Sequence, residues 1–291
     1  MGTFSALMTA VMWAAAVIFL KRSGETIPPF ALNFFRVVVS AVCLLVTIVA
    51  AGQHVFYGAP VKDYLTLFAS GVIAIAVSDT FFLMALNRVG AGIMAIIDCL
   101  YAPSVVLFAY ILLGERLGAW QWAGMALVIV GVLVAARHEP PEGITAKQVL
   151  AGSLFGVLSM ATVALGIVIA KPVLTRAPVL WATAMREIGA LLVMIPAALI
   201  VPGRRGIFGL FRPARNWKYS MPGTLLGSYL ALIFWIAGMK YSMAGPAAIL
   251  NQTSSIYVLI FASIFLKEPF TVRKVIASVL AIAGIVLVTL A

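Results

Sequence analysis

The sequence carries one pattern twice, and this constrains the fold more than any other feature. Residues 91–115 and 244–268 both begin with Ala-Gly and end in a glutamate, 153 positions apart, with no gap needed between them. The front parts of the two halves also pair, at an offset of 150, so that Arg36 matches Arg186. Self-similarity at a fixed spacing indicates a duplicated structural unit. We therefore interpret the chain as two copies of one structural unit.

The composition places this unit in a membrane. The chain is 64% hydrophobic and only 10% charged, with a mean hydropathy of +1.13. Soluble globular domains are about 45–50% apolar and about 25% charged, so that class is excluded. The net charge of +11 fits short loops that contact anionic lipid. A nucleic-acid partner is not expected, because no basic domain stands clear of the apolar segments.

Apolar runs bounded by charges, proline or glycine predict ten transmembrane helices, five in each half. The predicted fold is all-α integral membrane, with residues 1–137 as the first five-helix repeat, 138–148 as a connecting loop and 149–291 as the second repeat. An odd number of spans forces the second copy to be inverted relative to the first, as in many secondary transporters. The ten predicted spans are 3–20, 31–50, 64–86, 91–113, 118–136, 149–170, 179–201, 221–240, 244–266 and 272–290.

The basic residues of the loops give a prediction of orientation. Loops that follow the odd-numbered helices hold thirteen lysines and arginines, and loops on the opposite side hold five. The side richer in lysine and arginine usually faces the cytoplasm. This rule predicts that both termini lie outside.

The cysteines and histidines offer no metal site. Cys43 and Cys99 fall inside apolar segments, and His54 and His138 fall in predicted loops. A protein metal site needs several such ligands that converge. We therefore expect no metal, no other cofactor and no catalytic residue.

Five charged residues lie inside the predicted spans, at Arg36, Asp79, Asp98, Arg186 and Glu187. A charge in hydrocarbon costs roughly 2.5–3.5 kcal/mol on insertion scales, so each should face a partner or a wet cavity. The two arginines are repeat mates, and inversion should put them near opposite faces of the membrane. They serve either as structural anchors at the headgroups or as gates that attract a carboxylate. Glu187 is expected to pair between helices or to reach an interface.

Asp79 lies in the middle of its predicted helix and has an apolar repeat mate, Leu232. Three interpretations stay open. Its carboxylate could carry a proton, could balance an ammonium group on a substrate, or could anchor the structure.

A second polar cluster lies in the duplicated helices 91–113 and 244–266. Asp98 has Asn251 as its repeat mate, and each begins a short polar run. Pro103 cannot donate to the carbonyl of Cys99, so the first of these helices should kink there and expose a carbonyl group. A freed carbonyl needs a donor, which favours a cavity wall or a protein interface.

The motifs at the helix ends resemble those of the drug/metabolite transporter superfamily, and within it the bacterial exporters of the EamA type. Leu-Gly-Glu-Arg-Leu follows the fourth predicted helix, and Leu-Lys-Glu-Pro-Phe follows the ninth. The segment Pro29 to Arg36 is similar to that family's entry into its second helix, and Tyr101-Ala102-Pro103 fits its fourth. The resemblance covers essentially the whole chain.

The resemblance implies a transporter that exports amino acids, aromatic ones among them, or related small metabolites across the bacterial inner membrane by alternating access. It implies cytoplasmic termini, contrary to the charge count, and a monomer whose partners are the solute and membrane lipid. It also implies a central cavity, for which the candidate lining residues in this sequence are Trp13, Ser78, Asp79, Asp98, Tyr101, Thr162, Tyr229, Asn251, Gln252 and Ser254.

Two alternatives remain from the sequence. One is a flippase for lipid or an isoprenoid carrier built on the same scaffold. The other is an intramembrane enzyme that modifies lipid, although the separation of Asp79 from Asp98 gives no carboxylate pair at metal-binding spacing.

Overall fold

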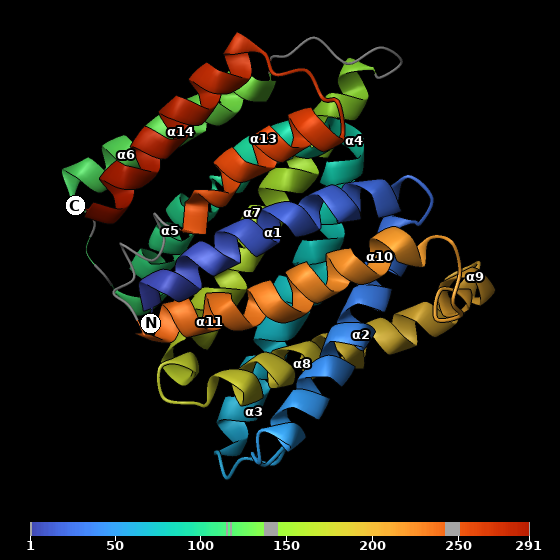
Figure 1. Cartoon of the computed structure of the whole chain (residues 1–291). Coiled ribbons are helices and arrows are strands. Elements are labelled where there is room, and N and C mark those ends of the chain that lie inside the picture. The colour runs from blue at the N-terminus through green and yellow to red at the C-terminus, as the bar shows by residue number, and fades with distance from the viewer. Residues whose placement is uncertain (1, 115, 117, 137–144, 242–250, 291) are drawn as a thin grey trace.

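The computed structural model describes residues 2–114, 116, 118–136, 145–241 and 251–290. These residues form helices joined by short turns, and no strand occurs among them (Figure 1). The repeat segment Ala244-Gly245, the glutamate Glu115 and residues 137–144 of the connecting loop lie outside the described residues. The helices are α1 Gly2–Gly24, α2 Pro29–Ala50, α3 Val61–Gly71, α4 Ser78–Asp98, α5 Tyr101–Leu113, α6 Ala119–Ala136, α7 Ala146–Leu174, α8 Val179–Ile200, α9 Arg204–Gly209, α10 Trp217–Gly223, α11 Leu232–Tyr241, α13 Ser254–Phe265 and α14 Val272–Leu290, with π-helical segments η1 Val72–Val77 and η2 Thr224–Ala231.

The predicted all-α membrane fold is confirmed in its main feature. Six helical stretches are long and apolar enough to cross a membrane, and three shorter apolar helices accompany them. The count of ten spans and the inversion of the second half stay predictions. The six stretches are Phe4–Gly24, Pro29–Ala50, Val61–Asp98, Lys147–Leu174, Val179–Ile200 and Trp217–Gly238.

The boundary predicted between helices 64–86 and 91–113 is confirmed by a break at Gly90. This residue has φ 82° and ψ 170°, inside the stretch that runs from Ser78 to Asp98. A positive φ is costly for residues with a Cβ atom, so glycine is the residue that allows the chain to turn here. The break leaves the first N–H groups of the following helical segment without intrahelical partners.

Glu268, from the loop between α13 and α14, satisfies two of these groups. Its carboxylate accepts the backbone N–H of Ala91 at 2.8 Å and that of Gly92 at 2.9 Å. A carboxylate at a helix N-terminus is also favoured by the helix dipole. The glutamate that ends the second copy of the repeat therefore fixes the start of a helix in the first copy.

We expect Glu268→Ala to lower the free energy of unfolding by about 1.5–3 kcal/mol, because both amide groups lose a charged acceptor. Thermal unfolding of the purified protein in detergent measures this change. Glu25→Ala is the control, because Glu25 pairs with Arg22 at the surface with half of its side chain exposed, and such pairs contribute about 1 kcal/mol or less. Equal effects of the two substitutions would contradict the capping role of Glu268.

A second break occurs at repeat-related positions in the two halves. Leu100 separates α4 from α5 with φ −67° and ψ −15°, and Thr253 precedes α13 with φ −61° and ψ −17°. The break at Leu100 confirms the kink predicted from Pro103. Thr253 has no proline after it, but the Asn-Gln-Thr-Ser-Ser run offers side-chain groups that compete for backbone partners.

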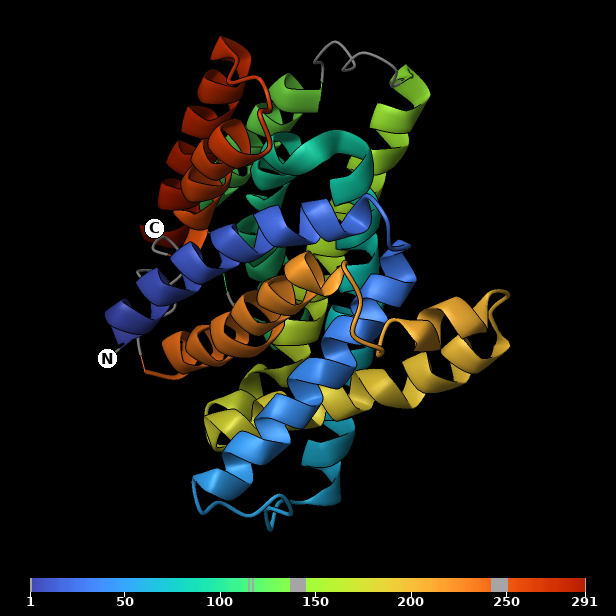
Figure 2. The same ribbon diagram turned by 45° about the vertical axis from the view of Figure 1, so that its right-hand side comes forward.

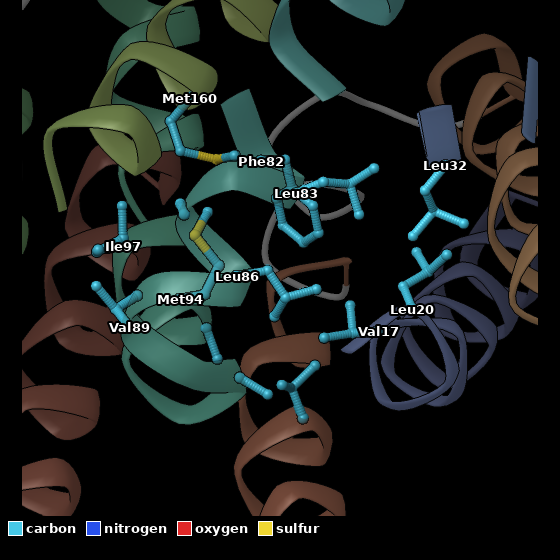
Figure 3. Packing of buried hydrophobic residues seen from close by; sticks show 14 of the residues in the cluster. Val17, Leu20, Leu32, Phe82, Leu83, Leu86, Val89, Met94, Ile97 and Met160 are labelled. Atoms are coloured by element: carbon cyan, nitrogen blue, oxygen red, sulfur yellow. The ribbon is translucent and has the colours of Figure 1, made fainter. Parts of the chain in front are cut away.

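The core of the molecule joins the two halves. Figure 3 shows Val17 and Leu20 of α1, Phe82 and Leu83 of α4, and Met160 of α7 in one hydrophobic cluster. These residues are buried. The cluster holds α1, α4 and α7 in place around the site described below.

Small residues set the closest approaches between helices. A Cβ atom on Gly152 of α7 would lie 2.6 Å from Val89 Cγ1 of α4, and one on Gly156 would lie 2.9 Å from Ile97 Cγ2. Glycine at this spacing lets helix backbones come together in membranes. These two glycines therefore let α7 pack closely against α4.

The last helices of the two halves, α6 and α14, form a pair at one edge of the molecule (Figures 1 and 2). A Cβ atom on Gly131 would lie 2.8 Å from the carbonyl oxygen of Ala277, and one on Gly284 would lie 2.6 Å from that of Gly124. The two backbones therefore touch, with no room for side chains between them.

Candidate solute-binding cavity

A cavity with a volume of about 140 Å³ lies between the two halves. Pockets for drug-sized ligands span about 300–1,000 Å³, so this one suits a smaller molecule. Both π-helical segments contribute to its wall, through Ala74 and Ile75 of η1 and Gly227, Ser228 and Ala231 of η2. π-Helical segments within α-helices are frequent at functional sites.

Most of the predicted site residues line this cavity. That they bind a solute stays a prediction. The predicted residues on its wall are Trp13, Ser78, Asp79, Asp98, Tyr101, Asn251, Gln252, Ser254, Arg36, Arg186 and Glu187.

Thr162 and Tyr229 do not line the cavity. The Thr162 hydroxyl donates to the carbonyl of Leu158 at 2.7 Å, within its own helix. The Tyr229 hydroxyl lies 2.6 Å from the hydroxyl of Thr47. Tyr229 belongs to η2, and the wider π-helical turn places Gly227, Ser228 and Ala231 on the cavity side instead.

Arg36 is held by contacts from both halves of the chain. Its Nε donates to Ser228 Oγ at 2.9 Å, and its Nη2 lies 3.4 Å from Asp79 Oδ2 in an ion pair. The arginine side chain is 1% exposed and that of Asp79 is 23% exposed. The ion pair therefore lies at the cavity wall, with the carboxylate reaching into the open space.

Arg186 lies at the same cavity, and the expectation that the two arginines occupy opposite faces is wrong. Its Nε donates to Ser70 Oγ at 3.0 Å, and its guanidinium lies over the ring of Trp235, 5.5 Å from the centroid. Both arginines and Asp79 line one cavity. Packing of α2 against α8 brings them together, because the two helices cross rather than stand parallel (Figure 1).

Glu187 completes a cluster of four charges with Arg36, Arg186 and Asp79, in which the formal charges balance. The Ser40 hydroxyl donates to Glu187 Oε1 at 2.7 Å. This buried contact joins α2 to α8 and fulfils the interhelical pairing expected of Glu187. We call these four residues the charge cluster.

Several polar atoms at the cavity are buried without a hydrogen-bond partner in the described part of the chain. Such atoms cost free energy unless something satisfies them, since buried polar groups in proteins are almost always paired. They are Arg36 Nη1, Tyr101 Oη, Arg186 Nη1, Glu187 Oε2 and Gln252 Oε1.

Aromatic rings form the apolar part of the wall. Trp13 of α1 and Phe82 of α4 lie with ring centroids 5.3 Å apart, and Tyr101 of α5 lies 6.1 Å from Trp235 of α11. The cavity therefore offers flat apolar surface beside its charged groups, which suits a solute with both characters.

The comparison with known proteins gives the family. The EamA-like transporter family model matches residues 1–137 and 150–290. The chain belongs to the EamA-like transporter family. The resemblance inferred from the sequence motifs is thereby confirmed, and this EamA-like protein is a multi-pass membrane protein with the apolar helices expected of one.

Relatives of this EamA-like protein are distant. One from Archaeoglobus fulgidus, named an uncharacterized transporter, is 24% identical over 98% of this chain and 96% of its own length. The match to an uncharacterized transporter of Clostridium kluyveri is 23% identical and spans 46% of this chain and 43% of that protein. A crystal structure with 18% identity covers 99% of this chain and 96% of its own, with a TM-score of 0.72, and shows the same fold.

Sequence reasoning missed several wall residues of this EamA-like protein. Ser40 does not line the cavity but contacts Glu187 of the charge cluster, and it could have been found because it lies one helical turn after Arg36 on the same face. Ser228 and Ser159 are single serines in apolar segments, and nothing in the sequence distinguishes them. Trp235 reads as an ordinary interfacial aromatic residue until the structure places it beside Arg186.

Proposed function

We propose that this EamA-like protein moves small carboxylate-bearing solutes, amino acids or related metabolites, out of the cell across a bacterial inner membrane. The observation that carries the proposal is the pair of buried guanidinium nitrogens, Arg36 Nη1 and Arg186 Nη1, at one small cavity. A carboxylate would supply the acceptor that both lack, and the planar guanidinium suits that partner.

Alternating access fits the way the chain is interrupted. Leu100 and Thr253 break repeat-related helices, and Tyr101, Gln252 and Ser254 beside the breaks line the cavity. Discontinuous helices at the interface between repeats are the common site architecture of secondary transporters. We propose ten spans in two inverted repeats, 1–137 and 149–291, which close alternately over the cavity of a monomer.

The cavity favours a solute over a lipid. A volume of about 140 Å³ suits a small solute better than the acyl or isoprenoid chains that a flippase would move. The rings of Trp13, Phe82, Tyr101 and Trp235 would contact an amino-acid side chain instead.

Purified protein in liposomes tests the proposal. We expect saturable flux of at least one of the twenty radiolabelled L-amino acids, measured with and without a pH gradient. Empty liposomes are the control. A parallel assay with fluorescent phospholipids reports any flippase activity. Movement of phospholipid with no flux of any amino acid would overturn the proposal.

Tyr101→Ala should raise the half-saturation concentration for aromatic amino acids about two- to tenfold, because an aromatic contact of roughly 0.5–1.5 kcal/mol is lost from the wall. Flux measured against substrate concentration gives the change. Tyr229→Phe is the matched control, since its hydroxyl pairs with Thr47 away from the cavity, and it should leave the half-saturation concentration unchanged. A larger effect at Tyr229 would place the solute elsewhere.

A further inference from the structure

Asp98 differs from the other carboxylates of the cavity because no described residue pairs with it. Asp79 pairs with Arg36, and Glu187 accepts from Ser40. In the part of the chain that the structure describes, the Asp98 carboxylate has no hydrogen bond and no ion pair, although it lies on the cavity wall.

The surroundings of Asp98 are rich in acceptors. Asp98 ends the helical segment that starts after Gly90, and the C-terminal end of a helix carries partial negative charge. The carbonyl of Cys99 loses its usual partner because Pro103 has no N–H. Gln252, 4% exposed, lines the same cavity and has its Oε1 buried without a donor. Together these acceptors call for a positively charged donor.

The charge cluster and Asp98 offer complementary groups to one cavity. The charge cluster presents unpaired guanidinium N–H groups, and its own formal charges balance. Asp98 adds a further carboxyl group to the same cavity, without a partner among the described residues. A solute with a carboxylate at one end and an ammonium group at the other would satisfy both.

We propose that Asp98, together with Gln252, selects a protonated amino group on the solute, while Arg36 and Arg186 receive its carboxylate. This inference rests on the proposed function, because it assigns the amino group and the carboxylate of the solute to residues of the same cavity. It makes Asp98 the residue that discriminates amino acids from simple carboxylic acids of the same size.

Equilibrium binding to the wild-type protein in detergent tests both assignments, that of the amino group and that of the carboxylate. Three matched sets of ligands share a side chain and differ in charge, and each set contains the amino acid, its deaminated acid and its decarboxylated amine. The sets are alanine with propanoate and ethylamine, leucine with 4-methylpentanoate and 3-methylbutylamine, and phenylalanine with 3-phenylpropanoate and 2-phenylethylamine.

In at least one set, we expect the amino acid to bind about 10- to 100-fold more tightly than either analogue, because each analogue lacks one charged hydrogen-bonding group. If no set shows this preference, the inference is wrong. Binding of sodium is measured separately, in sodium and in choline chloride. In a different outcome, sodium stabilises the protein, Asp98→Asn abolishes that stabilisation and no ligand set prefers the amino group. That result would assign the acceptor groups to a cation and would also overturn the inference.

Asp98→Asn keeps the size of the side chain and removes its charge. We expect the ratio of affinities for the amino acid and its deaminated acid to fall to about one, with the affinity for the deaminated acid retained. Glu25→Gln makes the same chemical change at an exposed carboxylate and should leave the ratio unchanged. A ratio unchanged by Asp98→Asn would contradict the role of Asp98.

Folding and function are separated by two further measurements. Size-exclusion profiles and melting temperatures show whether Asp98→Asn is folded, and if it is not, the wild-type ligand series decides alone. Flux in liposomes shows whether the proposed function holds. Flux of amino acids together with equal binding of the deaminated acids would reject the role of Asp98 and leave the proposed function standing.

Discussion

Arg36→Gln should lower the free energy of unfolding by about 3 kcal/mol and abolish solute flux. The substitution leaves Asp79 charged and without its partner, and breaking a buried pair in this way costs about 3–5 kcal/mol. The lower end of that range applies because Asp79 reaches into the cavity, with 23% of its side chain exposed. Thermal unfolding in detergent and flux in liposomes measure the two effects.

The double variant Arg36→Gln/Asp79→Asn separates the two effects. Neutral residues of similar size remove the uncompensated charge, so stability should return to within about 1 kcal/mol of the wild type. Flux should stay lost, because the solute carboxylate no longer finds Arg36. A double variant less stable than Arg36→Gln would show that the carboxylate of Asp79 stabilises the fold without the arginine.

Gly71→Ala should be the most damaging small substitution in the chain. A Cβ atom at Gly71 would overlap the backbone carbonyl oxygen of Arg186, so α3 and α8 could not keep their spacing. Overpacking typically costs 1–3 kcal/mol, and a clash with backbone cannot be relieved by a rotamer change, so we expect about 3 kcal/mol. Flux should fall as well, because the shift moves Arg186.

Gly206→Ala in α9 is the matched control for that substitution. A Cβ atom at Gly206 meets no atom within 4 Å, so the change should alter the unfolding free energy by about 0.5 kcal/mol or less. Comparison of the two variants by thermal unfolding and by yield of monodisperse protein checks the prediction. Equal stability of Gly71→Ala and the wild type would show that the α3–α8 contact is looser than the structure indicates.

Features that depend on local sequence were predictable. The turn at Gly90 follows from the interruption of an apolar run, and the break before α5 follows from the missing N–H of Pro103. Both depend on residues at the position itself and not on how distant helices pack.

Features that depend on how helices cross could not be predicted. Depth counted along α2 and α8 suggested that Arg36 and Arg186 lie near opposite faces, yet the packing of the two helices brings both to one cavity. The partners of these arginines, Ser228 and Ser70, lie far along the chain and carry no distinguishing pattern.

The sequence predicted the cavity wall only in part, because one segment of the wall is π-helical and not α-helical. The resemblance assigned Tyr229 to the wall, but η2 is π-helical and turns other residues inward. Likewise, the break at Thr253 matches that at Leu100 although the second copy has no proline there. Duplication preserved the geometry while the residues that produce it diverged.

The contact between α6 and α14 also bears on how such a chain arose. The last helix of each half has the last helix of the other half as its main partner, with backbones touching at Gly131 and Gly284. A protein made of a single half would expose this glycine-lined face unless it met a second copy of itself. The gene duplication would then have fused the two subunits of an existing homodimer. The interface between those subunits would have become the contact between α6 and α14 within one polypeptide.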